Sequence, residues 1–294
     1  MTYAEFLAHL DMRIAYLLKT LVLLLALIMC MQKTVNCQNL ILYKTIDTIK
    51  LYLEVHHAET NHAKNPAIIF FFGGGWIGGN RSHFIHHAQY FKKRGITCFL
   101  ADYRIANIHG TTPFESLRDA KSAIRYLRAH ANQLNIDPQK VIAAGGSAGG
   151  HLAAATAMID GFDDDQDDMS VDCVPNALVL YNPVIDNGPA GYGFERIGPS
   201  YKSFSPLHNI DCLVPPTILF LGTEDPLIPV ETAEYYANSI NRIGGRCDLH
   251  LFQGQRHGFF NYRNFDHYRT TVILTDEFLV DLGYVDQDPV VSIE

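Results

Sequence analysis

The segment 143–151 constrains this chain more than any other, because it places one serine between glycines at the point where a strand must turn into a helix. In a G-x-S-x-G turn the serine backbone is strained, and side chains in place of the glycines would collide with the neighbouring strand and helix. The run 141–144 is typical of a buried strand, and 152–158 is typical of a helix. The pattern predicts that Ser147 is a nucleophile. For the pentapeptide alone, the alternative is a flexible glycine-rich loop or a phosphate cradle at a helix N-terminus.

The composition of the chain fits one large α/β domain with a substantial core, because its 294 residues are 48% hydrophobic and 18% charged. The formal net charge of -8 leaves no basic surface to attract nucleic acid or anionic lipid. We therefore expect no nucleic-acid partner and favour a neutral or cationic one.

Residues 1–37 have the composition of a secretory signal. Basic residues precede an apolar run, and small residues stand before a cleavage site between Cys37 and Gln38. The uncharged stretch 20–32 is shorter than the roughly 20 residues that span a bilayer. We therefore expect a secreted or periplasmic protein with no stable membrane anchor, made of a signal peptide 1–37 and a functional domain 38–294. A membrane-anchored protein is the competing interpretation, and the chain can start at Met1 or at Met12.

The cysteines that remain after such cleavage would lie in a compartment that can be oxidising. Their spacing does not determine how they pair. None has C-x-x-C spacing, which argues against a zinc site or a redox motif, and we expect neither a metal nor a cofactor. These residues are Cys98, Cys173, Cys212 and Cys247.

Apolar runs alternate with amphipathic segments along the rest of the chain, as in an α/β fold with a mostly parallel central sheet flanked by helices. The irregular segment 182–216 is expected to form a short cover over the carboxyl edge of that sheet. Two strands, 40–43 and 49–55, are expected at an antiparallel edge. The other predicted strands are 67–72, 96–103, 141–144, 177–181, 217–221 and 247–252, and the predicted helices are 82–93, 113–133, 229–243 and 268–282.

A serine nucleophile needs an imidazole to accept its proton, and the imidazole needs a carboxylate to fix its tautomer. Asp225 and His257 each follow a predicted strand, so both should lie at the carboxyl edge of the sheet with Ser147. The chain order Ser, Asp, His is that of the α/β-hydrolase arrangement. Taken singly, Asp225 is equally typical of a turn or a helix cap and His257 of a loop, and Glu224 is the nearest rival carboxylate.

A tetrahedral intermediate also needs donors for its oxyanion. The glycine triplet 73–75 follows the first buried parallel strand and can turn its backbone N–H groups outward, although a lone triplet also suits a tight hairpin. The N–H group of Ala148, at the start of the elbow helix, is a second source.

Together these motifs resemble the α/β-hydrolase esterases, and in particular the bacterial acetyl-esterase and feruloyl-esterase-like branch, over nearly all of residues 40–282. The resemblance implies hydrolysis of carboxylic esters through an acyl-serine, with Ser147 as nucleophile, His257 as base and Asp225 as the orienting acid. It is carried by residues 72–76, 119–120, 146–152, 181–183, 222–225 and 254–260.

The resemblance also assigns the oxyanion hole to the N–H groups of Gly74, Gly75 and Ala148. One departure concerns the residue before the glycines, where the family commonly has a histidine that helps brace the loop and this chain has Phe72. This departure puts the geometry of the loop in question more than the activity. Trp76 and Tyr192 are candidates to line the substrate pocket, with ordinary packing as an equal contender.

Two polar clusters are expected to be unremarkable surface features. The acidic run 163–168 lacks the glycine and the spaced glutamate of a calcium loop and is interpreted as a solvated loop. His83, His86 and His87 have the helical spacing of metal ligands, but without an accompanying carboxylate motif we expect an exposed polar face.

The leading functional prediction is a secreted serine esterase for short-chain, above all acetyl, esters, including those of carbohydrates, because the short cover segment offers little surface for a long acyl chain. A prolyl-oligopeptidase-like serine peptidase shares this catalytic core but generally carries an N-terminal propeller. A non-catalytic binding module on the same fold is the third possibility, since fold does not fix function. The natural alcohol and the oligomeric state stay open.

Overall fold

The computed structural model describes residues 17–21, 39–59, 63–287 and 291–293. The predicted signal peptide 1–37 lies outside these residues except for 17–21, so it stays a prediction. Within the described ranges, no helix combines the length and the apolar character needed to cross a membrane. Residues 42–294 form one compact unit.

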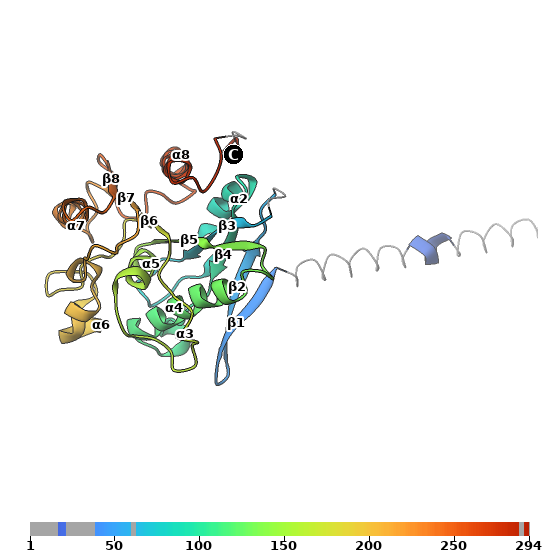
Figure 1. Cartoon of the computed structure of the whole chain (residues 1–294), viewed down its shortest axis with the longest axis horizontal. Coiled ribbons are helices and arrows are strands. Elements are labelled where there is room, and N and C mark those ends of the chain that lie inside the picture. Colours follow the sequence, from blue (N-terminus) through green and yellow to red (C-terminus); the bar gives the residue numbers. More distant parts are fainter. Residues whose placement is uncertain (1–16, 22–38, 60–62, 288–290, 294) are drawn as a thin grey trace, which may run out of the picture. The chain divides into compact units, whose positions relative to one another are not determined.

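The described residues contain one eight-stranded sheet in the order β1-β2-β4-β3-β5-β6-β7-β8 (Figure 1). β2 runs antiparallel to β4, and every pair from β4 to β8 is parallel, which confirms the predicted mostly parallel sheet with an antiparallel edge. The strands are β1 (Leu40–Ile46), β2 (Ile49–His56), β3 (Asn65–Phe71), β4 (Thr97–Ala101), β5 (Ile136–Gly146), β6 (Ala177–Tyr181), β7 (Thr217–Gly222) and β8 (Cys247–Phe252).

The central strands are continuous apolar runs because helices cover both faces of the sheet. On one face, α2 (Ile85–Lys93) and α8 (Phe265–Asp281) enclose an apolar core with alternate residues of the strands. The other face carries α4 (Pro113–Ala129), α5 (Ala148–Met158) and α7 (Val230–Arg242), as Figure 1 shows. The predicted fold class is therefore confirmed.

Local capping explains where two of these helices begin. Thr112 and Glu115 form a capping box at the start of α4, in which each side chain accepts a hydrogen bond from the backbone of the other end of the box. The predicted helix 82–93 starts instead as the 3-10 turn η1 (Arg81–Phe84), because the Asn80 side chain accepts a hydrogen bond from the N–H of Ser82.

The predicted cover segment between β6 and β7 is irregular, as expected, and holds only short helical turns. It packs down onto α5, where the buried His151 side chain donates a hydrogen bond from Nε2 to the carbonyl oxygen of Phe204 at 2.9 Å. The turns are α6 (Phe194–Ile197), η2 (Gly198–Ser203) and η3 (Pro206–His208).

The cysteines of the domain are free thiols. Cys98, Cys173 and Cys247 are buried, and burial raises the pKa of each thiol, to about 12 for Cys247. Cys212 is exposed.

The strand order creates a crevice at the carboxyl ends of β3 and β5. The chain leaves β3 to form β4 on one side and returns to form β5 on the other side of β3. Loops that follow two such neighbouring strands diverge, and ligands of open α/β sheets bind at this point. The glycine triplet follows β3 and Ser147 follows β5, so both lie at this crevice.

Candidate active site

Ser147 occupies a strained turn between β5 and α5, with φ of 55° and ψ of -120°. Close backbone packing enforces the turn: a Cβ atom added to Gly149 would lie 2.0 Å from the carbonyl oxygen of Phe71, and one added to Gly145 would lie 2.3 Å from that of Gly149. Both glycines are therefore required where the sequence places them. A non-glycine residue with positive φ at a strand end is a mark of a functional turn.

The structure brings Ser147, His257 and Asp225 into one chain of hydrogen bonds. His257 Nε2 lies 2.9 Å from Ser147 Oγ, and His257 Nδ1 lies 2.7 Å from Asp225 Oδ2. The other carboxylate oxygen of Asp225 accepts hydrogen bonds from the N–H groups of Leu227 and Ile228, at 2.9 and 3.2 Å. Because the ionised carboxylate accepts the Nδ1 hydrogen, Nε2 is left free to accept the serine proton.

The carboxylate of the site is Asp225 and not its neighbour Glu224. The Asp225 side chain is fully buried against His257, whereas Glu224 is exposed. The turns after β7 and β8 pack closely, since the N–H of Glu224 donates to the carbonyl oxygen of Gln255 at 2.9 Å and a Cβ on Gly222 would lie 2.2 Å from that oxygen. This contact holds the two loops that carry the acid and the base.

The glycine loop, residues 73–75, faces Ser147 across the crevice. Gly74 and Gly75 have φ of 136° and 65°, which favour glycine. The carbonyl oxygen of Gly74 accepts hydrogen bonds from two following N–H groups and closes the loop into a tight turn. Within the described part of the chain, the N–H groups of Gly74, Gly75 and Ala148 are paired with no acceptor.

A cavity of about 340 Å³ opens above Ser147. Tyr192 lines it, and Leu227 forms part of another wall. Trp76 does not reach it: its side chain is 1% exposed and packs behind Tyr192, with the two ring centroids 6.1 Å apart. The guanidinium of Arg196 lies over both rings. The other lining residues are Gly73, Gly74, Gly75, His83, Asn182, His257, Gly258, Phe260 and Asn261.

The expectation of an exposed histidine face on α2 is wrong for two of its three residues. His86 is exposed, but His87 is 1% exposed among aromatic rings, and His83 points into the crevice, where its Nδ1 accepts a hydrogen bond from the N–H of Gly73 at 3.0 Å. Burial lowers the pKa of both His83 and His87. Helical spacing gave no signal of this, because it does not show which side of a helix faces the sheet.

Asn182 is a second residue whose place at the site the motif analysis did not identify. Its Oδ1 accepts a hydrogen bond from the N–H of Gly258 at 2.9 Å, and its Nδ2 lies 3.5 Å from His257 Nε2. It thus fixes the loop that carries the histidine. Its position directly after β6, at the same sheet edge as the other site residues, was the available signal.

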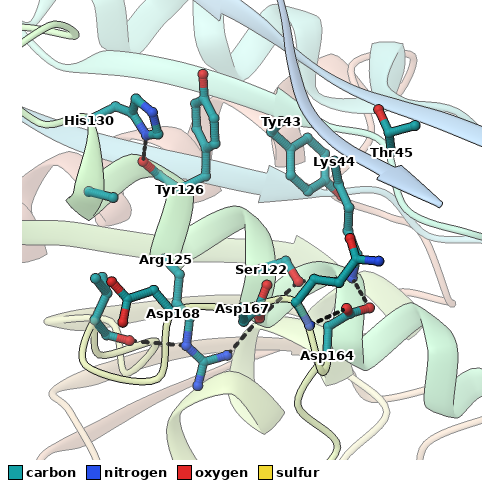
Figure 2. Close-up of a pocket in the computed structure, with 13 residues that line it drawn as sticks. Tyr43, Lys44, Thr45, Ser122, Arg125, Tyr126, His130, Asp164, Asp167 and Asp168 are labelled. Atoms are coloured by element: carbon teal, nitrogen blue, oxygen red, sulfur yellow. Dashed lines mark hydrogen bonds and ion pairs between the residues drawn. The ribbon is translucent and has the colours of Figure 1, made fainter.

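The acidic segment that begins at Asp163 lies away from this site and is not the solvated loop that its composition suggests. Figure 2 shows it beside a cavity of about 300 Å³, with Asp164 paired to Lys44 at 2.8 Å and Asp167 paired to Arg125 at 2.9 Å. Arg125 also contacts Asp163, at 2.7 Å. Basic side chains from β1 and α4 have recruited these carboxylates. Among the described residues, no three His, Cys, Asp or Glu side chains are grouped to hold a metal ion.

Comparison with known proteins places this geometry in context. The family model described as BD-FAE matches residues 53–188, which contain both the glycine loop and the Ser147 turn. The acetylxylan esterase of Xylanibacter ruminicola is 27% identical over 240 residues, which are 75% of this chain and 45% of that protein. The chain spans about half the length of the curated relatives it matches first.

Solved structures of Thermogutta terrifontis esterase 2 resemble the chain over almost their full length. The form phosphoramylated by tabun is 40% identical with a TM-score of 0.81, and the match covers 85% of this chain and 96% of that one. The propionate-bound form is 38% identical with a TM-score of 0.80 and the same coverage.

Proposed function

Because this chain belongs to the α/β-hydrolase serine esterases, we propose that it hydrolyses short-chain carboxylic esters through an acyl-serine formed on Ser147. The observation that carries the proposal is the unbroken set of contacts from Ser147 Oγ to His257 (2.9 Å) and from His257 to Asp225 (2.7 Å). A binding module has no need for a strained serine held in this way.

The proposed reaction begins when Ser147 Oγ attacks the ester carbonyl while His257 Nε2 takes its proton. The imidazolium, steadied by Asp225, then gives that proton to the departing alcohol oxygen as the tetrahedral intermediate collapses to the acyl-serine. Water attacks the acyl-serine in the same way, with His257 again accepting and returning a proton. The products are the carboxylic acid and free Ser147.

The oxyanion of each intermediate is proposed to bind the N–H groups of Gly74, Gly75 and Ala148. These groups have no acceptor within the described structure, and they flank the serine from the loops after β3 and β5. Losing one such donor typically costs about 3 kcal/mol of transition-state stabilisation.

Short acyl groups, with acetyl foremost, are the proposed substrates. The cavity of about 340 Å³ is bounded by Tyr192 from the short cover segment and by Leu227. A solved relative holds propionate, and a curated relative is an acetylxylan esterase, which supports acetyl esters of carbohydrates as the natural class. Secretion, directed by a signal peptide over residues 1–37, is part of the proposal and would give access to such extracellular substrates.

Labelling by a fluorophosphonate probe tests the mechanism. We expect wild-type protein to be labelled and Ser147→Ala not to be. Absence of labelling in the wild type would favour a binding module. The substrate class is tested by kcat/KM on acetyl, butyryl and octanoyl aryl esters and on acetylated xylo-oligosaccharides. Preference for octanoyl esters would refute the short-chain assignment, and release of proline-terminated peptides would favour a peptidase.

A further inference from the structure

His83 links the glycine loop to the loop that carries the catalytic histidine. Its Nδ1 accepts the hydrogen bond from Gly73, and its Nε2 lies 2.6 Å from Asn261 Oδ1. Asn261 Nδ2 in turn donates to the carbonyl oxygen of Gly258, the residue after His257, at 2.7 Å. Two loops that must act on one substrate atom are therefore held together by a single side chain.

The contacts define one protonation state of this imidazole. Nδ1 accepts from a backbone N–H, so it carries no hydrogen, and Nε2 must carry the hydrogen that it donates to Asn261 Oδ1. Burial lowers the pKa of His83, which keeps the ring neutral at neutral pH. A protonated ring would present a hydrogen to the Gly73 N–H and lose that contact.

The imidazole is held firmly enough to act as a brace. Its ring packs on Phe84 and Phe260, with centroid distances of 4.7 and 5.6 Å. Phe260 fits so closely beneath the serine turn that a Cβ on Gly146 would lie 2.5 Å from its ring. The ring of His83 is therefore referenced to the same aromatic support as the nucleophile.

Gly73 is the point where this brace meets the proposed oxyanion hole. A Cβ on Gly73 would lie 3.4 Å from the Cβ of Ser147 and 3.4 Å from Cε1 of His83, so the residue is sandwiched between nucleophile and brace. It directly precedes Gly74 and Gly75. Oxyanion donors must lie within a few tenths of an ångström of their working positions, and a misplacement of about 1 Å costs on the order of 100-fold in rate.

We propose that His83 is a positioning residue which, through Gly73 and Asn261, holds the glycine loop in register with Ser147 and His257. The inference rests on the ester hydrolysis proposed above. It also accounts for Phe72, which stands where a bracing histidine was expected: Phe72 stacks on Tyr103 at 4.0 Å, and the brace comes from the start of η1 instead.

Three variants test the proposal: His83→Leu, His83→Gln and His86→Leu. Leucine removes both hydrogen bonds. Glutamine keeps an oxygen to accept from Gly73 and an amide N–H to donate to Asn261. The matched control is His86, which lies on α2 close to His83 but is exposed and stacks on Tyr262. Steady-state kinetics on an aryl acetate and the rate of fluorophosphonate labelling are measured for each purified protein.

We expect His83→Leu to lower kcat and the labelling rate by about 10- to 100-fold with KM changed less than about threefold, because the substrate pocket is kept and only transition-state contacts are lost. His83→Gln should recover most of kcat, and His86→Leu should match the wild type. An unchanged kcat in His83→Leu, a loss confined to KM, or a glutamine variant as impaired as the leucine variant would overturn the proposal.

Asn261→Ala examines the same network from the other loop and guards against misfolding of His83→Leu. It should also lower kcat without raising KM, by a smaller factor, and an unchanged kcat would again overturn the brace. The two proposals fail differently. A wild type that is neither labelled nor active refutes the proposed function, whereas an active, labelled wild type with indifferent His83 and Asn261 variants refutes the brace alone.

Discussion

Acid sensitivity of the folded state should originate in part from His151, which lies one helical turn after the serine. The side chain is 0% exposed, donates to the carbonyl oxygen of Phe204, and lies edge-to-face with Trp76 at a centroid distance of 5.1 Å. Burial lowers the pKa of His151 to about 4 from its ordinary value of 6.5. Between these two pH values the unfolded chain binds a proton that the folded chain does not.

Lowering the pH through this window therefore favours unfolding. From the two pKa values, the free energy of unfolding should fall by about 2 kcal/mol on going from pH 7 to about pH 5, and by about 3 kcal/mol at about pH 4. Above about pH 7 the histidine is neutral in both states and contributes no slope. Other buried histidines, His83 and His87, add slopes of the same sign because burial also lowers their pKa.

Urea unfolding of the wild type and of His151→Gln isolates this contribution. The glutamine amide can still donate to Phe204 but does not titrate. At pH 7 we expect the variant to be about 1–2 kcal/mol less stable because packing against Trp76 is lost. By about pH 5 the wild type should have lost about 2 kcal/mol more than the variant, so that the two curves meet. A stability gap that is the same at both pH values would refute the reasoning.

Three further predictions concern the site and its support. Asp225→Asn should lower kcat by about 10⁴-fold, because an amide does not hold the required tautomer, while the matched variant Glu224→Gln keeps wild-type kinetics; equal losses in both would contradict the assignment. Gly149→Ala should cost more than about 4 kcal/mol in urea unfolding or abolish soluble expression, since its Cβ would lie 2.0 Å from the Phe71 oxygen, and near-native stability would show that this contact relaxes. His87→Leu should raise stability by about 1–2 kcal/mol in thermal or urea unfolding, and more near pH 5, because neither ring nitrogen has a partner in the described structure; a destabilised variant would argue against this.

The sheet and the three residues aligned at its edge were predictable because their signals are local. A strand buried on both faces reads as a continuous apolar run, and residues that directly follow such runs must reach the same edge of a parallel sheet. Ser147, Asp225 and His257 are each of this kind. Their mutual distances were not available from the sequence, but their common edge and their order were.

Residues that contact partners far away in the sequence were not predictable in the same way. His83 and Asn261 are 178 positions apart, and no spacing rule connects them. The acidic run was interpreted as solvated because the basic residues that pair with it, Lys44 and Arg125, lie on β1 and α4. Periodicity indicates that a helix has a buried side, but the polar residues on that side are explained only by what the neighbouring loops present to them.

The position of Phe72 nevertheless carried information that physical reasoning can extend. The N–H of Gly73 lies at a crowded junction beside Ser147, and a buried backbone N–H without an acceptor is strongly disfavoured. A chain with phenylalanine before its glycines has no acceptor there, so another element must supply one. The imidazole of His83 does so, and because it also contacts Asn261, the substitute ties the glycine loop to the histidine loop. A departure from a motif at such a junction therefore predicts a compensating acceptor among the residues that face it.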